Sequence, residues 1–281
     1  MPPVAELPPD LDETIRTALD EDIGPGDVTT HSVVPQDTEV VGRFVAREEG
    51  VVAGIGVAYR VFSRLGAVRW DQTVDDGDRV GPATRLATIR GEARTVLTGE
   101  RVALNFLTHL SGIATLTRRY VEACSDTESV ILCTRKTLPG LRSLERYAVQ
   151  QGGGVLHRAG LYEAVLIKDN HVAVAGGVGE AVRRARAGAD GEVEVEVDTL
   201  DQLHDALEAG ADRILLDNPT VETVERALDV VAGRVPLEVS GGMTIEKVRR
   251  FAPLGPLQIS VGRITHSAPA LDISLEVDPA G

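Results

Sequence analysis

The sequence predicts an α/β protein in which a closed or nearly closed α/β barrel follows a smaller α+β domain. From residue 130 onward, short aliphatic or β-branched runs alternate with amphipathic helical patterns, and none carries a dinucleotide-binding glycine fingerprint. Strands that alternate with helices form parallel sheets. Before residue 100, by contrast, short strand-like runs neighbour one another, which is typical of antiparallel pairing.

Six barrel strands are expected. Each is a short apolar run that ends in polar or glycine residues, and the runs cover 130–136, 164–170, 192–198, 213–218, 235–242 and 257–263. A complete barrel of this type has about eight strands. Either two strands are hidden within 98–129, or the barrel is incomplete.

Amphipathic helices separate the later strands. Leu200, Leu203 and Leu207 share one face, and similar spacing recurs over 221–231 and 245–251. The starts of three helices are marked by Thr199, by Asn218 followed by Pro219, and by Thr244.

The first hundred residues predict a domain of short antiparallel strands, one helix at 56–66 and a turn at 75–78. A long helical stretch, interrupted near Ser111 and Gly112, links this domain to the barrel. We therefore expect an N-terminal α/β sandwich domain at 1–108 and a barrel domain at 109–267. The last residues, 268–281, contain one further strand that could pack back on the first domain.

Charge and composition argue against several classes of partner. The net charge of −14 disfavours binding to nucleic acid or to an anionic membrane. No apolar run is long enough to cross a bilayer, and the acidic, proline-containing start lacks a signal-peptide pattern. We expect a cytoplasmic protein whose two cysteines, Cys124 and Cys133, are reduced and buried.

Basic residues gather at the expected strand ends, where barrels of this kind carry their catalytic and binding residues. Arg135 and Lys136 end one run, Lys168 ends the next, and His157 with Arg158 precede it. Arginine binds carboxylate or phosphate through two parallel hydrogen bonds, and lysine adds a point charge. Five such residues at one barrel mouth favour a site for a small polyanion over a solvated surface.

Two acidic residues, Glu196 and Asp217, end adjacent strands. Glu196 is the member of an alternating glutamate run that lies nearest the barrel mouth. The two carboxylates could hold a divalent metal or stabilise a developing cation. A salt bridge to Lys136 or Lys168 is the alternative.

Glycine-rich stops follow the last two strands, and they favour a phosphate site over an ordinary turn. Backbone N–H groups that glycine leaves uncovered bind phosphate at this position in many barrels. The candidate residues are Ser240, Gly241, Gly242, Gly262 and His266.

Motifs spread in order over nearly the whole chain resemble the quinolinate phosphoribosyltransferase family, also called nicotinate-nucleotide pyrophosphorylase (carboxylating). These motifs are "ALDEDIGPGDVTT", "GERVALNFLTHLSGIAT", "TRKTLPGLR", "GGGVLHR", "LIKDNH", "EVEVD", "LLDN", "EVSGGM" and "VGRITHS". The resemblance implies an N-terminal sandwich domain with an incomplete barrel of about seven strands. It also implies a homodimer in which each barrel mouth faces the partner's N-terminal domain.

The resemblance further implies an Mg²⁺-dependent reaction of quinolinate with phosphoribosyl pyrophosphate. The products would be nicotinate mononucleotide, pyrophosphate and CO₂, on the de novo route to NAD. Lys136, Lys168, Glu196 and Asp217 would carry the catalysis, and the last two would face the ribose and the metal.

By the same match, Arg101 of "GER" would reach the partner subunit's site. The quinolinate carboxylates and part of the phosphoribosyl donor would be bound by Arg135, Lys136, His157, Arg158 and Lys168. The phosphate would be bound by Ser240, Gly241, Gly242, Gly262 and His266.

Two positions depart from the family pattern: Leu138 stands where a polar residue is common, and Arg263 replaces a small residue. Arg263 could contact phosphate or point to solvent. One rival interpretation is a paralogous family associated with molybdenum transport genes. Another is a non-catalytic phosphometabolite-binding barrel, for which the acidic pair would have no use.

Overall fold

The computed structural model describes residues 6–280. The ends of two predicted segments, 1–5 of the N-terminal domain and residue 281, lie outside the described residues. Two compact units emerge: the first contains residues up to 118, 137–153 and those from 265 on, and the second contains 119–136 and 154–264.

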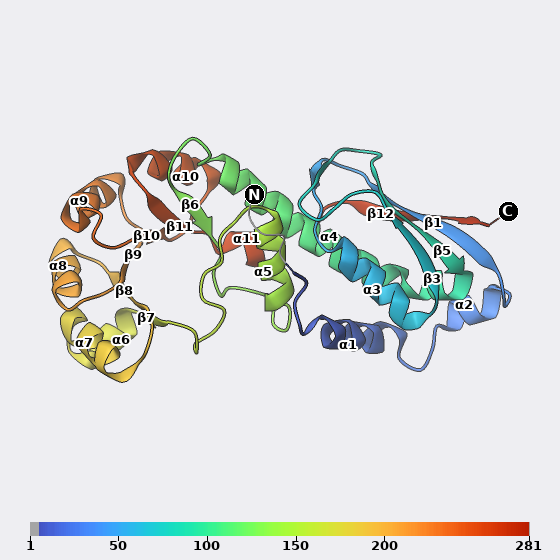
Figure 1. Cartoon of the computed structure of the whole chain (residues 1–281), viewed down its shortest axis with the longest axis horizontal. Coiled ribbons are helices and arrows are strands. Elements are labelled where there is room, and N and C mark those ends of the chain that lie inside the picture. Colours follow the sequence, from blue (N-terminus) through green and yellow to red (C-terminus); the bar gives the residue numbers. More distant parts are fainter. Residues whose placement is uncertain (1–5, 281) are drawn as a thin grey trace. The chain divides into compact units, whose positions relative to one another are not determined.

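The first unit contains a four-stranded antiparallel sheet in the order β12-β1-β5-β3 (Figure 1). Its strands are β1 (Glu39–Ala46), β3 (Val68–Gln72), β5 (Arg85–Glu92) and β12 (Ile273–Pro279). A small antiparallel ladder joins β2 (Gly50–Val51) to β4 (Arg79–Val80). Because β12 pairs with β1, the segment that follows the barrel completes the sheet of the first unit.

Helices of the first unit pack around an apolar core. They are α1 (Leu11–Ile23), α2 (Val28–Val33), α3 (Ile55–Leu65), most of α4 (Ala93–Glu122) and α5 (Arg142–Gln151). Phe62 of α3 contacts the sheet through Phe44 and Trp70, with ring centroids 6.0 Å and 6.3 Å away. Phe44 and Phe62 are fully buried, so this cluster fixes α3 on the sheet.

The expected interruption of α4 near Ser111 and Gly112 is wrong, because α4 is one continuous helix. Ser111 instead binds a neighbouring loop: its hydroxyl accepts the Ala53 N–H at 3.0 Å and lies 3.2 Å from the Ala53 carbonyl oxygen. Gly112 provides room, since a Cβ there would lie 2.1 Å from the carbonyl oxygen of Pro269. Both residues therefore serve packing.

The second unit is built on six parallel strands in the order β6-β11-β10-β9-β8-β7. They are β6 (Val130–Leu132), β7 (Val165–Ile167), β8 (Val193–Val197), β9 (Arg213–Asp217), β10 (Leu237–Ser240) and β11 (Leu257–Ser260). A single parallel bridge between Leu132 and Val155 adjoins β6. The predicted α/β class with an incomplete barrel is confirmed. The sheet has the six strands counted from the sequence, which is fewer than the about seven that the family resemblance implies.

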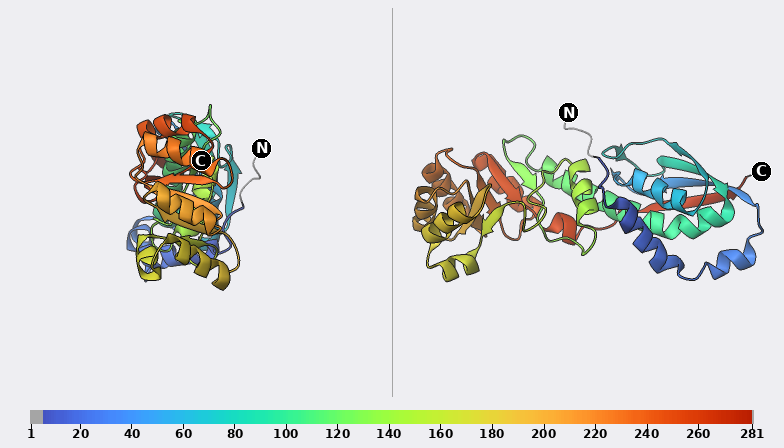
Figure 2. Two further views of the ribbon diagram at one scale, coloured as in Figure 1. Left: turned by 90° about the vertical axis from the view of Figure 1, so that its left-hand side faces the viewer. Right: turned by 60° about the horizontal axis from the view of Figure 1, so that its bottom comes forward.

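Helices cover the outer side of these strands, as Figure 2 shows for the yellow to orange segments. They are α6 (Asp169–Ala175), α7 (Val178–Gly188), α8 (Leu200–Glu208), α9 (Val221–Val231) and α10 (Ile245–Phe251), followed by the 3₁₀ turn η1 (Ala252–Leu254). A last short helix, α11 (Arg263–His266), follows β11.

Two of the three predicted helix starts are confirmed. The hydroxyls of Thr199 and Thr244 accept backbone N–H groups at the starts of α8 and α10. The prediction for α9 is wrong, because its N-cap is Thr220, two residues beyond Asn218. Asn218 has a φ of 49° and donates its N–H to the Ser240 carbonyl, so it belongs to the turn at the end of β9.

Within the described part of the chain, no helix combines the length and the apolar composition that crossing a membrane requires. Cys124 and Cys133 are both buried, as expected.

Candidate active site

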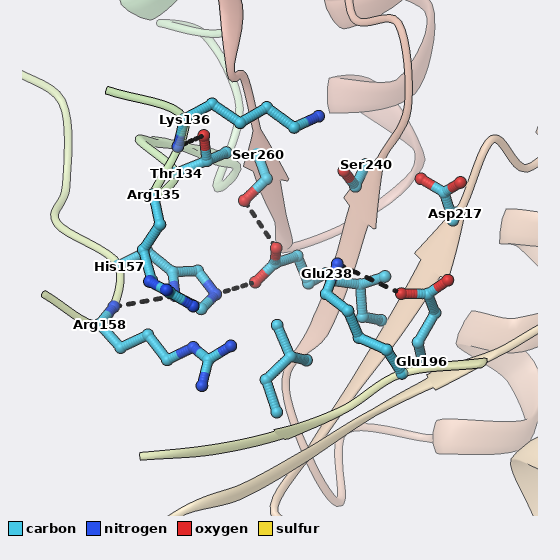
Figure 3. A pocket seen from close by; sticks show the side chains of 13 residues that line it. Thr134, Arg135, Lys136, His157, Arg158, Glu196, Asp217, Glu238, Ser240 and Ser260 are labelled. Carbon is cyan, nitrogen blue, oxygen red and sulfur yellow. Dashed lines mark hydrogen bonds and ion pairs between the residues drawn. The ribbon is translucent and has the colours of Figure 1, made fainter. Parts of the chain in front are cut away.

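A cavity of about 420 Å³ opens at the carboxyl ends of the second unit's strands (Figure 3). The predicted residues that line it are Arg135, Lys136, His157, Arg158, Lys168, Glu196, Asp217 and Ser240. Figure 3 shows Arg135, His157 and Arg158 on one side and Glu196 with Asp217 on the other. The parallel sheet therefore gathers groups that lie up to about a hundred residues apart in the sequence.

The guanidinium groups of Arg135 and Arg158 lie on the basic side of the cavity. Burial lowers the pKa of Arg158, and the positive charge of Arg135 lowers it further. Arg158 Nη1 donates to the Ala164 carbonyl at 3.0 Å, which fixes the side chain. Two cations held close together repel each other, and a ligand with two negative charges relieves that repulsion.

The run "LIKDNH" ends β7 and delivers Lys168 to the cavity. Lys168 donates its backbone N–H to His171 Nδ1 at 3.0 Å, and Asp169 Oδ1 accepts the Asn170 N–H at 2.7 Å. These polar residues hold the start of α6. The Lys168 side chain is 52% exposed, so its ammonium reaches the cavity mouth.

The acidic side combines Glu196 and Asp217. Burial raises the pKa of Glu196, and the Asp217 carboxylate adds to the rise although Lys168 opposes it. Lys168 Nζ lies 3.7 Å from Glu196 Oε2, so one of the two salt bridges considered as an alternative is present. A divalent cation would relieve the repulsion between the two carboxylates, and oxygen ligands of this kind suit Mg²⁺.

The glycine turn after β10 is tied to Asp217. Gly241 has a φ of 102°, and a Cβ there would lie 2.3 Å from Asn218 Cγ. Asn218 Nδ2 in turn donates to Asp217 Oδ2 at 2.7 Å. Lys247 Nζ approaches the Gly241 carbonyl oxygen at 3.4 Å, which brings a further cation to this turn. Glycine at position 241 thus allows the close approach of two strand ends.

Three further polar residues of the cavity were missed by sequence reasoning: Thr134, Glu238 and Ser260. Glu238 is only 1% exposed and lies two residues before Ser240 on β10. Residues two apart on a strand point to the same side, and this alternation is the signal that could have identified Glu238. Ser260 Oγ donates to Glu238 Oε1 at 2.6 Å.

His157 lies between two buried carboxylates. Its Nε2 is 3.2 Å from Glu194 Oε2 and 3.2 Å from Glu238 Oε2. Burial disfavours a charge on the ring, but hydrogen bonds to Glu194 and Glu238 outweigh it and raise the pKa of His157 to about 9. The backbone N–H of Arg158 opposes full protonation, because it donates to Nδ1 at 2.8 Å.

The same trio could offer three ligands to a metal ion, with donor atoms that all lie within 4.8 Å of one another. A metal ligand must offer a lone pair, but His157 Nδ1 already accepts the Arg158 N–H, so Nε2, the nitrogen that faces both carboxylates, carries the proton. The trio is therefore better described as a hydrogen-bonded cluster.

The remaining predicted residues lie elsewhere in their units. Gly241 and Gly242 form the turn after β10, and Gly262 follows β11. His266 ends α11, with Nδ1 2.6 Å from Ser267 Oγ. Arg101 is an exposed residue of α4. Leu138 and Arg263, the two departures from the family pattern, are both exposed.

Both halves of the chain match family models: residues 27–111 match "Quinolinate phosphoribosyl transferase, N-terminal domain" and residues 113–276 the corresponding C-terminal domain. A nicotinate-nucleotide pyrophosphorylase [carboxylating] from Mycobacterium leprae is 46% identical over 273 residues, covering 94% of this chain and 96% of that protein. The chloroplastic enzyme of that name from Arabidopsis thaliana is 40% identical, covering 96% and 83%. The solved structure of NadC from Streptococcus pyogenes superposes with a TM-score of 0.95 at 40% identity, covering 99% and 100%.

Proposed function

The chain belongs to the quinolinate phosphoribosyltransferase family, and from this we infer that it joins quinolinate to the phosphoribosyl group of phosphoribosyl pyrophosphate. The products are nicotinate mononucleotide, pyrophosphate and CO₂, which makes the protein a pentosyltransferase of de novo NAD biosynthesis. The observation that carries this function is the separation of charge in the cavity, with cations on one side and carboxylates on the other.

The basic side suits the dicarboxylate. Arg135, Lys136 and Arg158 provide the donors that two carboxylates of one aromatic ring require, and His157 supports them. Holding both carboxylates turns the ring nitrogen towards C1 of the ribose. Orientation of this kind supplies a large part of the rate acceleration in reactions between two bound substrates.

The acidic side suits the ribose. Departure of pyrophosphate from C1 builds positive charge on the sugar, and carboxylates at Glu196 and Asp217 stabilise that charge. Lys168, next to Glu196, offsets negative charge on the substrates. Decarboxylation then follows N-ribosylation, because a quaternised ring nitrogen stabilises the carbanion that CO₂ leaves behind.

Magnesium is part of the proposal. Glu196 and Asp217 would hold it, as a pair of carboxylates whose mutual repulsion a cation relieves. Bound Mg²⁺ would neutralise charge on the pyrophosphate leaving group. The phosphate of the donor would lie at the turn of Ser240, Gly241 and Gly242, with Gly262 and His266 contributing from the next strand end.

A homodimer that completes the site with the partner's Arg101 is also proposed. Helix α6, which follows the cavity lysine, contains no buried residue. Nearby large apolar side chains are strongly exposed, with Leu161 at 75%, Tyr162 at 88% and Val174 at 89%. Apolar surface of this kind supports coverage by a second copy of the chain.

Neither rival is favoured. Arg135, Lys136, His157 and Arg158 line the cavity, and the acidic pair opposite them has no role in simple anion binding. A cytoplasmic location stays part of the proposal and rests on the composition of the sequence.

Turnover of the two substrates is the direct test. Purified protein with quinolinate, phosphoribosyl pyrophosphate and Mg²⁺ should release CO₂ and form nicotinate mononucleotide. Nicotinate in place of quinolinate should react poorly, because it lacks one of the two carboxylates. Absence of product with quinolinate would overturn the proposed function.

A further inference from the structure

Glu238 is a negative side chain at the floor of a cavity that suits negatively charged ligands. It is 1% exposed, and groups from four elements surround it. Ser260 of β11 donates to it at 2.6 Å, Arg213 of β9 lies at 3.7 Å, and His157 lies at 3.2 Å in the loop before β7. Glu194 of β8 is the fourth neighbour, because it shares His157 Nε2 with Glu238.

A buried carboxylate at this place needs an explanation. It would repel quinolinate, and its burial is costly unless hydrogen bonds and charges compensate. Ser260 and Arg213 provide that compensation, so Glu238 is held in one position. The held carboxylate also lies at hydrogen-bond distance from the imidazole of His157 on the cavity wall.

The two ring nitrogens of His157 have different partners. Nδ1 accepts the backbone N–H of Arg158 at 2.8 Å, and Nε2 lies at hydrogen-bond distance from Glu238. Nε2 carries a proton both in the charged ring and in the neutral ring that leaves Nδ1 as an acceptor. Nε2 therefore requires an acceptor in either state, and Glu238 supplies one.

We propose that Glu238 is a positioning residue for quinolinate binding: it fixes the His157 ring and, through Nδ1, the backbone of Arg158. This inference rests on the proposed function. The family resemblance implies that His157 binds substrate. With both ring nitrogens bonded to the protein, His157 instead supports Arg158. Arg158 then presents its guanidinium from a fixed backbone and a fixed side chain, since Nη1 is bound to the Ala164 carbonyl.

Substitution of Glu238 tests the proposal. Glu238→Met keeps the side-chain length and removes one of the two carboxylates that lie 3.2 Å from His157 Nε2, so the KM for quinolinate should rise about tenfold, the effect of losing one hydrogen bond to a charged group. The KM for phosphoribosyl pyrophosphate should stay within about twofold. Glu238→Gln keeps an acceptor oxygen and should recover most of the quinolinate affinity.

Two further variants separate positioning from a loss of stability. Ser260→Ala removes a support of Glu238 and should raise the same KM by a smaller factor. Asp76→Asn is the matched control, since Asp76 also binds two donors, the Ile55 N–H at 3.0 Å and the Tyr147 hydroxyl at 2.5 Å, but within the first unit. It should leave the KM for quinolinate unchanged.

A double variant tests the route through the imidazole. In a His157→Leu background, Glu238→Met should have no further effect on the KM for quinolinate. A further tenfold rise there, or equal rises for both substrates in Glu238→Met, would overturn the positioning role.

Failure of the proposed function is distinguishable from failure of this inference. Wild-type protein without turnover would overturn the function, and the quinolinate Kd of the same variants, measured by calorimetry, would then decide the role of Glu238. An unchanged Kd in Glu238→Met would overturn the positioning role, and a raised one would support it.

Discussion

The ammonium of Lys168 lies 3.7 Å from the carboxylate of Glu196. The two residues come from adjacent strand ends, because Ile167 of β7 pairs with Val195 of β8. One cation therefore stands at the meeting point of the basic and the acidic side of the cavity. Half of the Lys168 side chain is exposed, so this ion pair is better placed to stabilise negative charge on the substrates than to stabilise the fold.

Lys168→Met should separate these two effects. We expect kcat/KM to fall about 10- to 100-fold, as for the loss of one charge-assisted contact to substrate. The free energy of unfolding should change by less than about 1 kcal/mol, because exposed ion pairs stabilise little. Arg184→Met is the control: Arg184 pairs with Glu180 at 2.8 Å on α7, and its loss should leave turnover unchanged. Unchanged turnover in Lys168→Met would contradict the assignment.

Gly241→Ala should damage both the fold and the site. The φ of 102° disfavours a side chain, and the new Cβ would displace Asn218. We expect a loss of about 2 kcal/mol in the free energy of unfolding and a large loss of activity. Gly233→Ala provides the control, because Gly233 also has a positive φ of 72° but no neighbour within 4 Å. Equal destabilisation of the two variants in urea titrations would show that the contact with Asn218 is unimportant.

Gly112→Ala should destabilise the protein although alanine favours helices. A mid-helix glycine usually costs about 1 kcal/mol relative to alanine. Here the added Cβ would lie 2.1 Å from the Pro269 carbonyl oxygen, which is backbone and cannot easily move. We expect a net loss of about 1 to 3 kcal/mol. Gly188→Ala in α7 meets no neighbour within 4 Å and should be neutral or stabilising in the same unfolding experiment.

Asp27 should make stability depend on acid pH. It caps α2 by accepting the Thr30 N–H at 2.9 Å and also accepts the Thr98 hydroxyl at 3.0 Å. Hydrogen bonds from Thr30 hold the pKa of Asp27 below its ordinary value of 3.8. The ionised group therefore stabilises the fold above that value, and this contribution is lost as the pH falls through the lowered pKa.

Asp27→Asn should accordingly be less stable than wild type at pH 7, and the difference should be smaller at pH 3. Asp27→Ala, which also removes the cap, should lose about 1 kcal/mol at pH 7. Urea unfolding at the two pH values measures this. If the free energies of unfolding of wild type and Asp27→Asn differed by the same amount at both pH values, the charge of Asp27 would not be the cause of the difference.

Mixing two inactive variants tests the shared site. Arg101→Ala and Lys136→Ala each disable both sites of a homodimer, but a mixed dimer contains one intact site. Random exchange makes half of the dimers mixed, and half of their sites intact, so about a quarter of wild-type activity should return. No recovery, with mixed dimers demonstrated by mass spectrometry, would exclude the contribution of Arg101 to the partner subunit's site.

Much of the second unit could be predicted from the sequence because buried parallel strands are short apolar runs with polar ends. Parallel strands end at the same edge of a sheet, so the positions of Arg135, Lys168 and Asp217 at strand ends correctly predicted that they line one cavity. Sequence patterns did not show the floor of that cavity. Glu194 and Glu238 are acidic residues inside apolar strands, and their partnership depends on which strands neighbour each other and on where the His157 loop crosses them.

Predictions that depended on a single residue type were less successful. Gly112 indicates a helix break by propensity, yet its actual role is set by Pro269, a residue more than 150 positions away. Asn218 and Pro219 have the composition of a helix start, but the hydrogen bond from Asn218 to Ser240 draws that residue into the preceding turn. In both cases a long-range contact outweighed the local preference.

The pairing of β12 with β1 has a consequence for synthesis. The seven residues of β1 from Val40 to Ala46 pair with residues 273–279. These partners leave the ribosome only after the whole barrel has been translated. Until then the nascent first unit presents an open edge, where another chain could add a strand. Rapid emergence of the last residues, or a chaperone that shields this edge, would protect the newborn protein from aggregation.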